Sequence, residues 1–167
     1  KTRLEIALTH FDWVKIRSML IITVYAICKD ERLNVDRWLK SFSRATIVCI
    51  LDTGSTDGTW EYLQEQQKKY PNLILAQKEI KPWRYDKARD ASMLLIPKNT
   101  DIFFMADLDE EIKEEDWPDK VREAWDPLFS RMMYNYHRDL DENGNIMRTI
   151  KEYRIHSKAW THWVNIV

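Results

Sequence analysis

The sequence predicts an α/β fold: a doubly wound, mostly parallel sheet with helices on both faces and a C-terminal antiparallel hairpin. Short apolar runs that do not alternate with polar residues are typical of strands buried on both faces of a parallel sheet. Segments with apolar residues at helical spacing separate these runs, as right-handed β-α-β crossovers require. Near the end of the chain, Asn143-Gly144 is a strong turn signal between two further strand-like segments.

The elements are expected in a regular order. Residues 1–18 show no clean period and stay an uncertain lead-in, either a helix or an edge strand. The first helix follows from apolar residues at helical spacing over 35–42, the second stops at Pro71 and the third ends at Pro97. Buried strands are predicted at 20–27, 46–51, 72–77 and 102–106, and the strands of the hairpin at 132–138 and 146–156.

Composition restricts the possible functions. The chain has 167 residues, 44% of them hydrophobic, which suffices for one domain with a real core. A formal net charge of −1 without a long basic run argues against a nucleic-acid partner. Cys28 and Cys49 lie inside apolar runs, which indicates buried thiols and a reducing, cytoplasmic location. The apolar run 19–28 is too short to cross a bilayer, so no membrane span is expected.

An acidic pair follows the predicted strand at 102–106. Asp107 and Asp109 are one residue apart, so on an extended backbone their carboxylates point the same way. Hard carboxylate oxygens suit Mg2+ or Mn2+, and ligands bind at the carboxyl ends of strands in open α/β sheets. With the acidic residues at 110–119, the pair also fits a solvated helix start at the positive end of a helix dipole. The segment alone leaves both interpretations open.

Four polar clusters follow predicted strands or begin predicted helices. In a doubly wound sheet such positions converge on one edge, and this convergence favours a binding site over unrelated surface charges. Gly54 and Gly58 in one of these clusters permit a sharp turn, and Ser55, Thr56 or Asp57 can cap the helix that follows. The clusters are Asp30-Glu31, Asp52–Thr59, Asp86–Asp90 and Asp107–Asp109.

Taken in order, these clusters resemble the family-two glycosyltransferases of the GT-A fold with their D-x-D motif. The resemblance spans roughly residues 20–112, and an ordered set of motifs is more specific than any one of them. It implies transfer of a sugar from a nucleotide-diphosphate donor, with UDP as the nucleotide, inversion at the anomeric carbon and a divalent metal. The matching phrases are Cys28-Lys-Asp-Glu31, Leu51-Asp-Thr-Gly-Ser-Thr-Asp-Gly-Thr59, Lys87-Ala-Arg-Asp-Ala-Ser92 and Met105-Ala-Asp-Leu-Asp-Glu110.

The resemblance also implies a role for individual residues. Asp52 matches the carboxylate that reads the nucleotide base, and Glu31 matches an acidic residue near the ribose or base. Arg89 matches the basic residue that meets base or phosphate; as an alternative, it is a surface arginine paired with Asp86 or Asp90. Asp107 and Asp109 match the D-x-D pair, with Asp107 near the ribose and sugar and Asp109 on Mn2+ or Mg2+.

The sequence departs from the family pattern at several positions. Asp90 stands where many members have Asn, and Leu108 stands where a small residue is frequent. Members with a similar C-terminal phrase place a metal-binding histidine shortly after the tryptophan, whereas this sequence ends with Trp163-Val-Asn-Ile-Val167. His156 and His162 are the nearest substitutes, although each is more typical of a structural or surface histidine.

The resemblance divides the chain into a lead-in at 1–18 and a single domain at 19–167. Within that domain we expect a nucleotide-binding half at 19–112 and an incomplete acceptor half at 113–167. An inverting transfer needs a general base, which is not assigned and is expected beyond Val167. The partners are thus a nucleotide-sugar donor and an unknown acceptor: a glycan, a protein or a small molecule.

Two alternatives to a complete transferase remain. The chain interrupts an apolar phrase at its last residue, so it reads as a fragment that could serve as a non-catalytic nucleotide-sugar-binding module of a larger protein. Nucleotidyl transfer on a related fold is a weaker alternative, because no glycine-rich loop with a lysine for a triphosphate is present.

Overall fold

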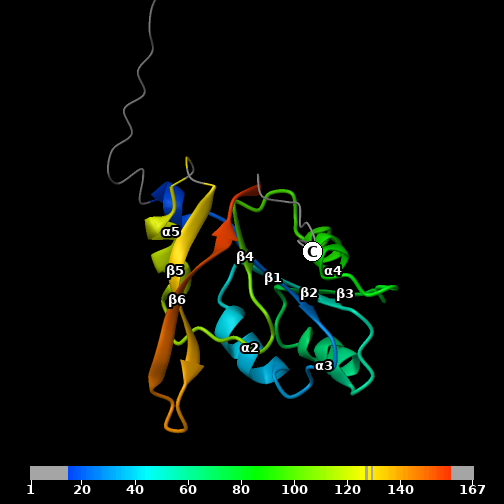
Figure 1. Cartoon of the computed structure of the whole chain (residues 1–167). Coiled ribbons are helices and arrows are strands. Elements are labelled where there is room, and N and C mark those ends of the chain that lie inside the picture. Colours follow the sequence, from blue (N-terminus) through cyan, green and yellow to red (C-terminus); the bar gives the residue numbers. More distant parts are fainter. Residues whose placement is uncertain (1–14, 127, 129, 159–167) are drawn as a thin grey trace, which may run out of the picture.

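Six strands form one mixed sheet in the order β3-β2-β1-β4-β6-β5 within the part of the chain that the structure describes (Figure 1). The structure is a computed structural model, and it describes residues 15–126, 128 and 130–158. The first four strands are parallel, and the last two form an antiparallel hairpin that joins the sheet beside β4. The strands are β1 (Ile22–Cys28), β2 (Ile47–Asp52), β3 (Leu73–Gln77), β4 (Ile102–Met105), β5 (Arg131–Leu140) and β6 (Ile146–His156).

Helices cover both faces of the parallel part, as Figure 1 shows. Trp38, Leu63 and Trp117, from three different helices, join the larger core cluster on one face. The smaller cluster on the other face includes Tyr25 and Phe103, and residues at and just beyond the end of α4 (Tyr85–Met93) pack against it. The helices are α2 (Val35–Phe42), α3 (Thr59–Gln66), α4 (Tyr85–Met93) and α5 (Trp117–Ala124). The predicted fold class is therefore confirmed.

The sequence predictions differ from the structure mainly at helix ends. α3 stops at Gln66 instead of continuing to Pro71, because the chain makes a turn over 67–69. Its N-cap is Gly58, in the left-handed conformation with a φ of 87°, and not one of the polar residues before it. α5 was not predicted from the sequence. Its Pro118 lies in the first turn, where the missing N–H costs nothing.

The acidic segment after β4 is a loop and not the start of a helix. Residues 107–114 have no helical structure, and α5 begins only at Trp117, with Asp116 as its N-cap. The loop is fixed on α2, because Ile112 N–H donates to Ser41 Oγ at 2.6 Å. The helix-start interpretation therefore fails for Asp107 and Asp109.

Two further expectations concern the termini and the cysteines. Most of the lead-in at 1–18 falls outside the described residues. Its described part, Lys15–Ser18, is helical. Cys28 and Cys49 are buried free thiols, as predicted. In the described part of the chain, no helix is both long and apolar enough to cross a membrane.

Candidate functional site

Two loops at the carboxyl ends of β1 and β2 hold each other in place. Asp30 N–H donates to Ser55 Oγ at 2.8 Å, and Thr56 N–H donates to the Asp30 carboxylate at 2.6 Å. Arg32 N–H donates to the carboxylate of Asp57 at 3.1 Å. These bonds satisfy backbone donors that neither loop satisfies alone, so the two loops form one edge of the site.

Asp52 ends β2 and organises the loop that follows it. Its Oδ1 accepts hydrogen bonds from the backbone N–H groups of Gly54 at 2.9 Å and Ser55 at 3.0 Å, and from Gln77 at 3.1 Å. The residue is fully buried. Burial alone would raise its pKa, but the hydrogen bonds from Ser55, Gly54 and Gln77 outweigh burial and lower the pKa. Asp52 is therefore an ionised carboxylate inside the loop and does not line an open surface.

Glu31 is linked to the acidic loop through α2. Its carboxylate accepts a hydrogen bond from Asn34 at 2.6 Å, and Asn34 accepts one from Arg37 at 3.1 Å. The same guanidinium nitrogen of Arg37 donates to the backbone oxygen of Asp109 at 3.0 Å. The start of α2 thus positions Glu31 relative to the acidic loop. The link ends at the backbone of Asp109 and not at its carboxylate.

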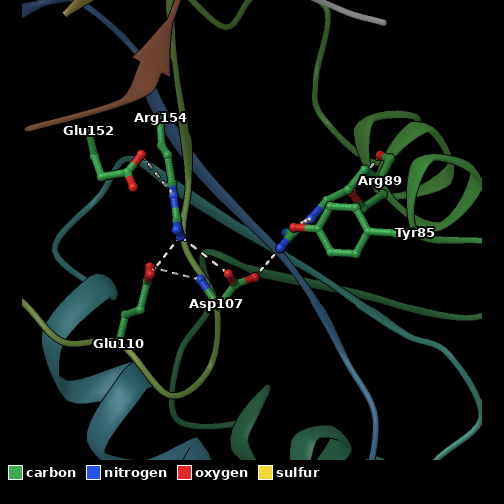
Figure 2. Close-up of polar contacts among 7 residues, drawn as sticks. Tyr85, Arg89, Asp107, Glu110, Glu152 and Arg154 are labelled. Atoms are coloured by element: carbon green, nitrogen blue, oxygen red, sulfur yellow. Dashed lines mark hydrogen bonds and ion pairs between the residues drawn. The ribbon is translucent and has the colours of Figure 1, made fainter. Parts of the chain in front are cut away.

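Arg89 points from α4 to the acidic loop. Its side chain is fully buried, and its guanidinium donates to Asp107 and, at 2.9 Å, to the hydroxyl of Tyr85 (Figure 2). The remaining nitrogen, Nη1, is buried without a hydrogen-bond partner in the described part of the chain. The alternative of a surface arginine is wrong, because Arg89 is fully buried and pairs with Asp107, while Asp86 pairs with Arg84.

Arg154 reaches Asp107 from the opposite direction, on β6. Figure 2 shows its guanidinium between the carboxylates of Asp107 and Glu110. Nη1 lies 3.2 Å from Asp107 Oδ2 and 2.5 Å from Glu110 Oε1, while Nε lies 3.7 Å from Glu152. Burial would lower the pKa of Arg154, but Glu110 and Asp107 outweigh burial and raise the pKa further above neutrality. Asp107 is consequently held by two arginines from two different elements.

A cavity of about 330 Å³ lies between the acidic loop and the hairpin. It combines carboxylates with guanidinium groups, so it suits a polar, charged ligand. Burial raises the pKa of Glu110, even though Arg154 opposes the shift, and burial with the nearby Glu110 raises the pKa of Tyr136 to about 12. The lining residues are Asp107, Asp109, Glu110, Tyr136, Arg138, Ile150, Glu152 and Arg154.

The structure brings together some of the predicted site residues and separates others. Arg89 and Asp107 are in direct contact, and Asp107 and Asp109 line the same cavity. Glu31 is connected to this group through Asn34 and Arg37 at the start of α2, and Asp52 is enclosed by its own loop.

A divalent cation does not fit the acidic pair in this arrangement. Both oxygens of Asp107 contact arginines, and the described residues include no group of three or more His, Cys, Asp or Glu side chains placed to hold a metal. His156 does not supply a ligand either. It is buried, its Nε2 lies 2.9 Å from the Tyr25 hydroxyl and its ring stacks on Phe103. His162 lies outside the described residues.

The contribution of the hairpin to the cavity was not predicted from the sequence. Arg138 on β5, together with Glu152 and Arg154 on β6, lines the cavity. A signal was present, because residues two apart on a strand face the same side, and Ile150, Glu152 and Arg154 share this spacing. Nothing in the spacing alone shows that this side faces Asp107.

Comparison with solved structures identifies the fold. A mannosyltransferase from Pyrobaculum calidifontis, solved with GDP-Man and Mn2+, superposes with a TM-score of 0.57 at 18% identity, over 66% of this chain and 34% of that one. TarS from S. aureus, solved with UDP, superposes with a TM-score of 0.52 at 19% identity, over 61% of this chain and 31% of that one. The chain has a glycosyltransferase fold.

The likeness is one of fold and not of sequence. No protein-family profile matches the chain, and no curated protein matches its sequence. The chain spans about a third of the length of these two solved structures, since the matched part covers 34% of the mannosyltransferase and 31% of TarS.

Proposed function

We propose that this chain binds a nucleotide-sugar donor as part of an inverting, family-two glycosyltransferase of the GT-A type. The observation that carries the proposal is the charged cavity beside Asp107 and Asp109, at the carboxyl end of a central parallel strand. In open α/β sheets this edge is where ligands bind. Further support comes from the two similar structures, which were solved with GDP-Man and with UDP.

Four residues in or near the acidic loop have a role in the proposal. Glu31 accepts hydrogen bonds from the ribose or base, and Asp52 shapes the loop that meets the base. Asp107 orients the ribose and sugar, since carboxylates accept strong hydrogen bonds from hydroxyl groups. Arg89 meets base or phosphate, and its buried Nη1 is a donor that no described residue uses.

The reaction creates negative charge on the departing nucleotide diphosphate. Guanidinium groups aimed at that charge stabilise the transition state more than the ground state, because they are already oriented and partly desolvated. Arg154 lines the cavity and supplies such a group, since its carboxylate partners orient it and it is partly buried. Arg138 also lines the cavity and adds positive charge from an exposed position. UDP is the proposed nucleotide. Inversion also requires a general base on the opposite face of the sugar, and we assign no described residue to that role.

Metal use is a narrower part of the proposal. Asp109 and Asp107 are the carboxylates that would hold Mn2+ or Mg2+ once Asp107 is released from its arginines. The similar mannosyltransferase was solved with Mn2+. Because Asp107 is already paired with two arginines, we assign no step of the reaction to the cation.

Calorimetric titration with UDP tests the proposal, with GDP titrated in parallel to establish the choice of base. We expect UDP to bind, and Glu31→Gln to weaken binding about tenfold, as the loss of one hydrogen bond to a charged group predicts. Glu61→Gln is the matched control, because Glu61 is exposed on α3 and has no assigned role. A folded sample that binds neither nucleotide refutes the proposal.

A binding module without catalysis is the second candidate. It is favoured by the pairing of both Asp107 oxygens with Arg89 and Arg154, which leaves this half of the acidic pair without the free oxygens that a metal-dependent transfer needs. Hydrolysis of a UDP-sugar by the purified chain, lost in Asp109→Ala, supports the enzyme; donor binding without hydrolysis supports the module.

A further inference from the structure

Arg154 occupies the space between two carboxylates of the acidic loop. One nitrogen, Nη1, contacts both Asp107 at 3.2 Å and Glu110 at 2.5 Å. Glu110 is nearly buried, with 8% of its side chain exposed, and Arg154 is 21% exposed. Charge-assisted hydrogen bonds between partly buried groups are stronger than those at an open surface, so these contacts hold the Arg154 guanidinium in place between the two carboxylates.

The same carboxylate oxygens are those that a divalent cation would need. Mg2+ and Mn2+ bind carboxylate oxygens directly, and the number of charged ligands sets the affinity. An oxygen that faces a guanidinium N–H at hydrogen-bond distance cannot at the same time coordinate a cation from that side. Arg154 Nε also lies 3.7 Å from Glu152. With Asp107, Glu110 and Glu152 all facing this guanidinium, Asp109 is the one carboxylate among the cavity's described lining residues that Arg154 does not contact.

We propose that Arg154 is a built-in cation of this pocket, which competes with divalent metal ions for Asp107 and Glu110 and thereby sets how strongly the site depends on metal. The inference rests on the proposed function for its meaning, because a fixed guanidinium facing the cavity would neutralise part of a diphosphate without a metal. Because Arg154 contacts oxygens of both Asp107 and Glu110, a metal ion can bind these oxygens only after the Arg154 side chain moves away.

Titration with Mn2+ alone, followed by electron paramagnetic resonance of the free ion, tests the competition without any nucleotide. In Arg154→Met the carboxylates of Asp107 and Glu110 lose this partner, and we expect Mn2+ to bind at least about tenfold more tightly than to the wild type. Arg138→Met is the matched control. It removes the same charge from the same cavity, but Arg138 is not among the residues that pair with Asp107 or Glu110. We expect the control to change Mn2+ affinity by less than about threefold, as for a general charge effect.

Two results overturn the inference: equal Mn2+ affinity in the wild type and in Arg154→Met, or an equal gain in Arg138→Met. If Arg154→Met does not fold, Arg154→Lys replaces it, since a lysine ammonium lacks the planar fork of arginine and holds the two carboxylates less well. Mn2+ affinity above that of the wild type in Arg154→Lys then supports the inference, and unchanged or weaker affinity overturns it.

UDP titration in the presence of a chelator separates this inference from the proposed function. A folded wild type that binds neither UDP nor GDP without the chelator refutes the proposed function and leaves the Mn2+ result intact. UDP binding that persists in the chelator and falls at least about tenfold in Arg154→Met supports the role of Arg154 as the built-in cation. UDP binding that persists but is unchanged by Arg154→Met counts against that role.

Discussion

Replacing Asp107 by Asn should destabilise the protein more than replacing Arg89, the buried arginine of its two partners, by Met. Arg89 is fully buried, whereas the Asp107 side chain is 36% exposed. In Asp107→Asn, a buried guanidinium keeps its charge but loses its counter-charge. Breaking a buried pair from one side costs about 3 to 5 kcal/mol, and we expect the low end because Asn still offers a carbonyl oxygen.

Arg89→Met should cost much less stability than Asp107→Asn. It removes the buried charge together with Nη1, which is buried without a hydrogen-bond partner in the described part of the chain. Asp107 remains partly exposed and remains paired with Arg154. The expected cost is at most about 1 kcal/mol, because apolar replacement of a buried charge is often nearly neutral.

Urea and thermal unfolding measure the difference between the two variants. A loss of about 3 kcal/mol corresponds to a decrease in Tm of roughly 6 to 12 °C for a chain of this size. In the double variant Arg89→Met/Asp107→Asn, stability should recover by at least about 1 kcal/mol relative to Asp107→Asn, because the uncompensated charge is gone. The reasoning is refuted if Arg89→Met costs as much as Asp107→Asn, or if the two losses simply add.

Three further predictions concern single residues. The lowered pKa of Asp52 means that its contribution to stability is complete above the unfolded pKa of about 3.9 and is lost as pH falls through the folded pKa. The wild type minus Asp52→Asn difference in unfolding free energy should therefore shrink below pH 4, and a constant difference would contradict this. Burial lowers the pKa of His156, so stability should fall as pH decreases from about 6.5, and urea unfolding of His156→Gln should show a smaller fall. Gly58→Ala should cost about 1 kcal/mol from backbone strain alone, because φ is +87° and, among the described residues other than its chain neighbours, none has an atom within 4 Å of the added Cβ. Gly58→Asn should cost less in the same assay.

The regular part of the fold could be predicted because its signals are local. β4 is apolar throughout and buried, and β1 is apolar apart from Thr23 and almost entirely buried. α2 has the predicted boundaries over Val35–Phe42. Asn143-Gly144 marked the hairpin, because its turn requires a positive φ and Gly144 has one of +80°. The end of α3 was missed, since the apolar spacing continued to Tyr70 while the chain had already turned.

The candidate site was predictable only in part. Positions after strand ends indicated Asp52 and Asp107, because parallel strands end at one edge of the sheet. The sequence could not show that Arg154 bridges Asp107 and Glu110, because that contact joins residues 44 or more positions apart and depends on how the hairpin packs against β4. It also could not show that Asp52 turns into its own loop.

Chemical-shift mapping of the 15N-labelled protein during titration with UDP tests the central claim most directly. If the carboxyl ends of the parallel strands form the nucleotide site, the largest shifts should fall in the interlocked loops at 29–34 and 53–58 and in the acidic loop at 107–110. Shifts confined to α5 or to the hairpin turn at 141–145, or no shifts at a saturating UDP concentration, would contradict it.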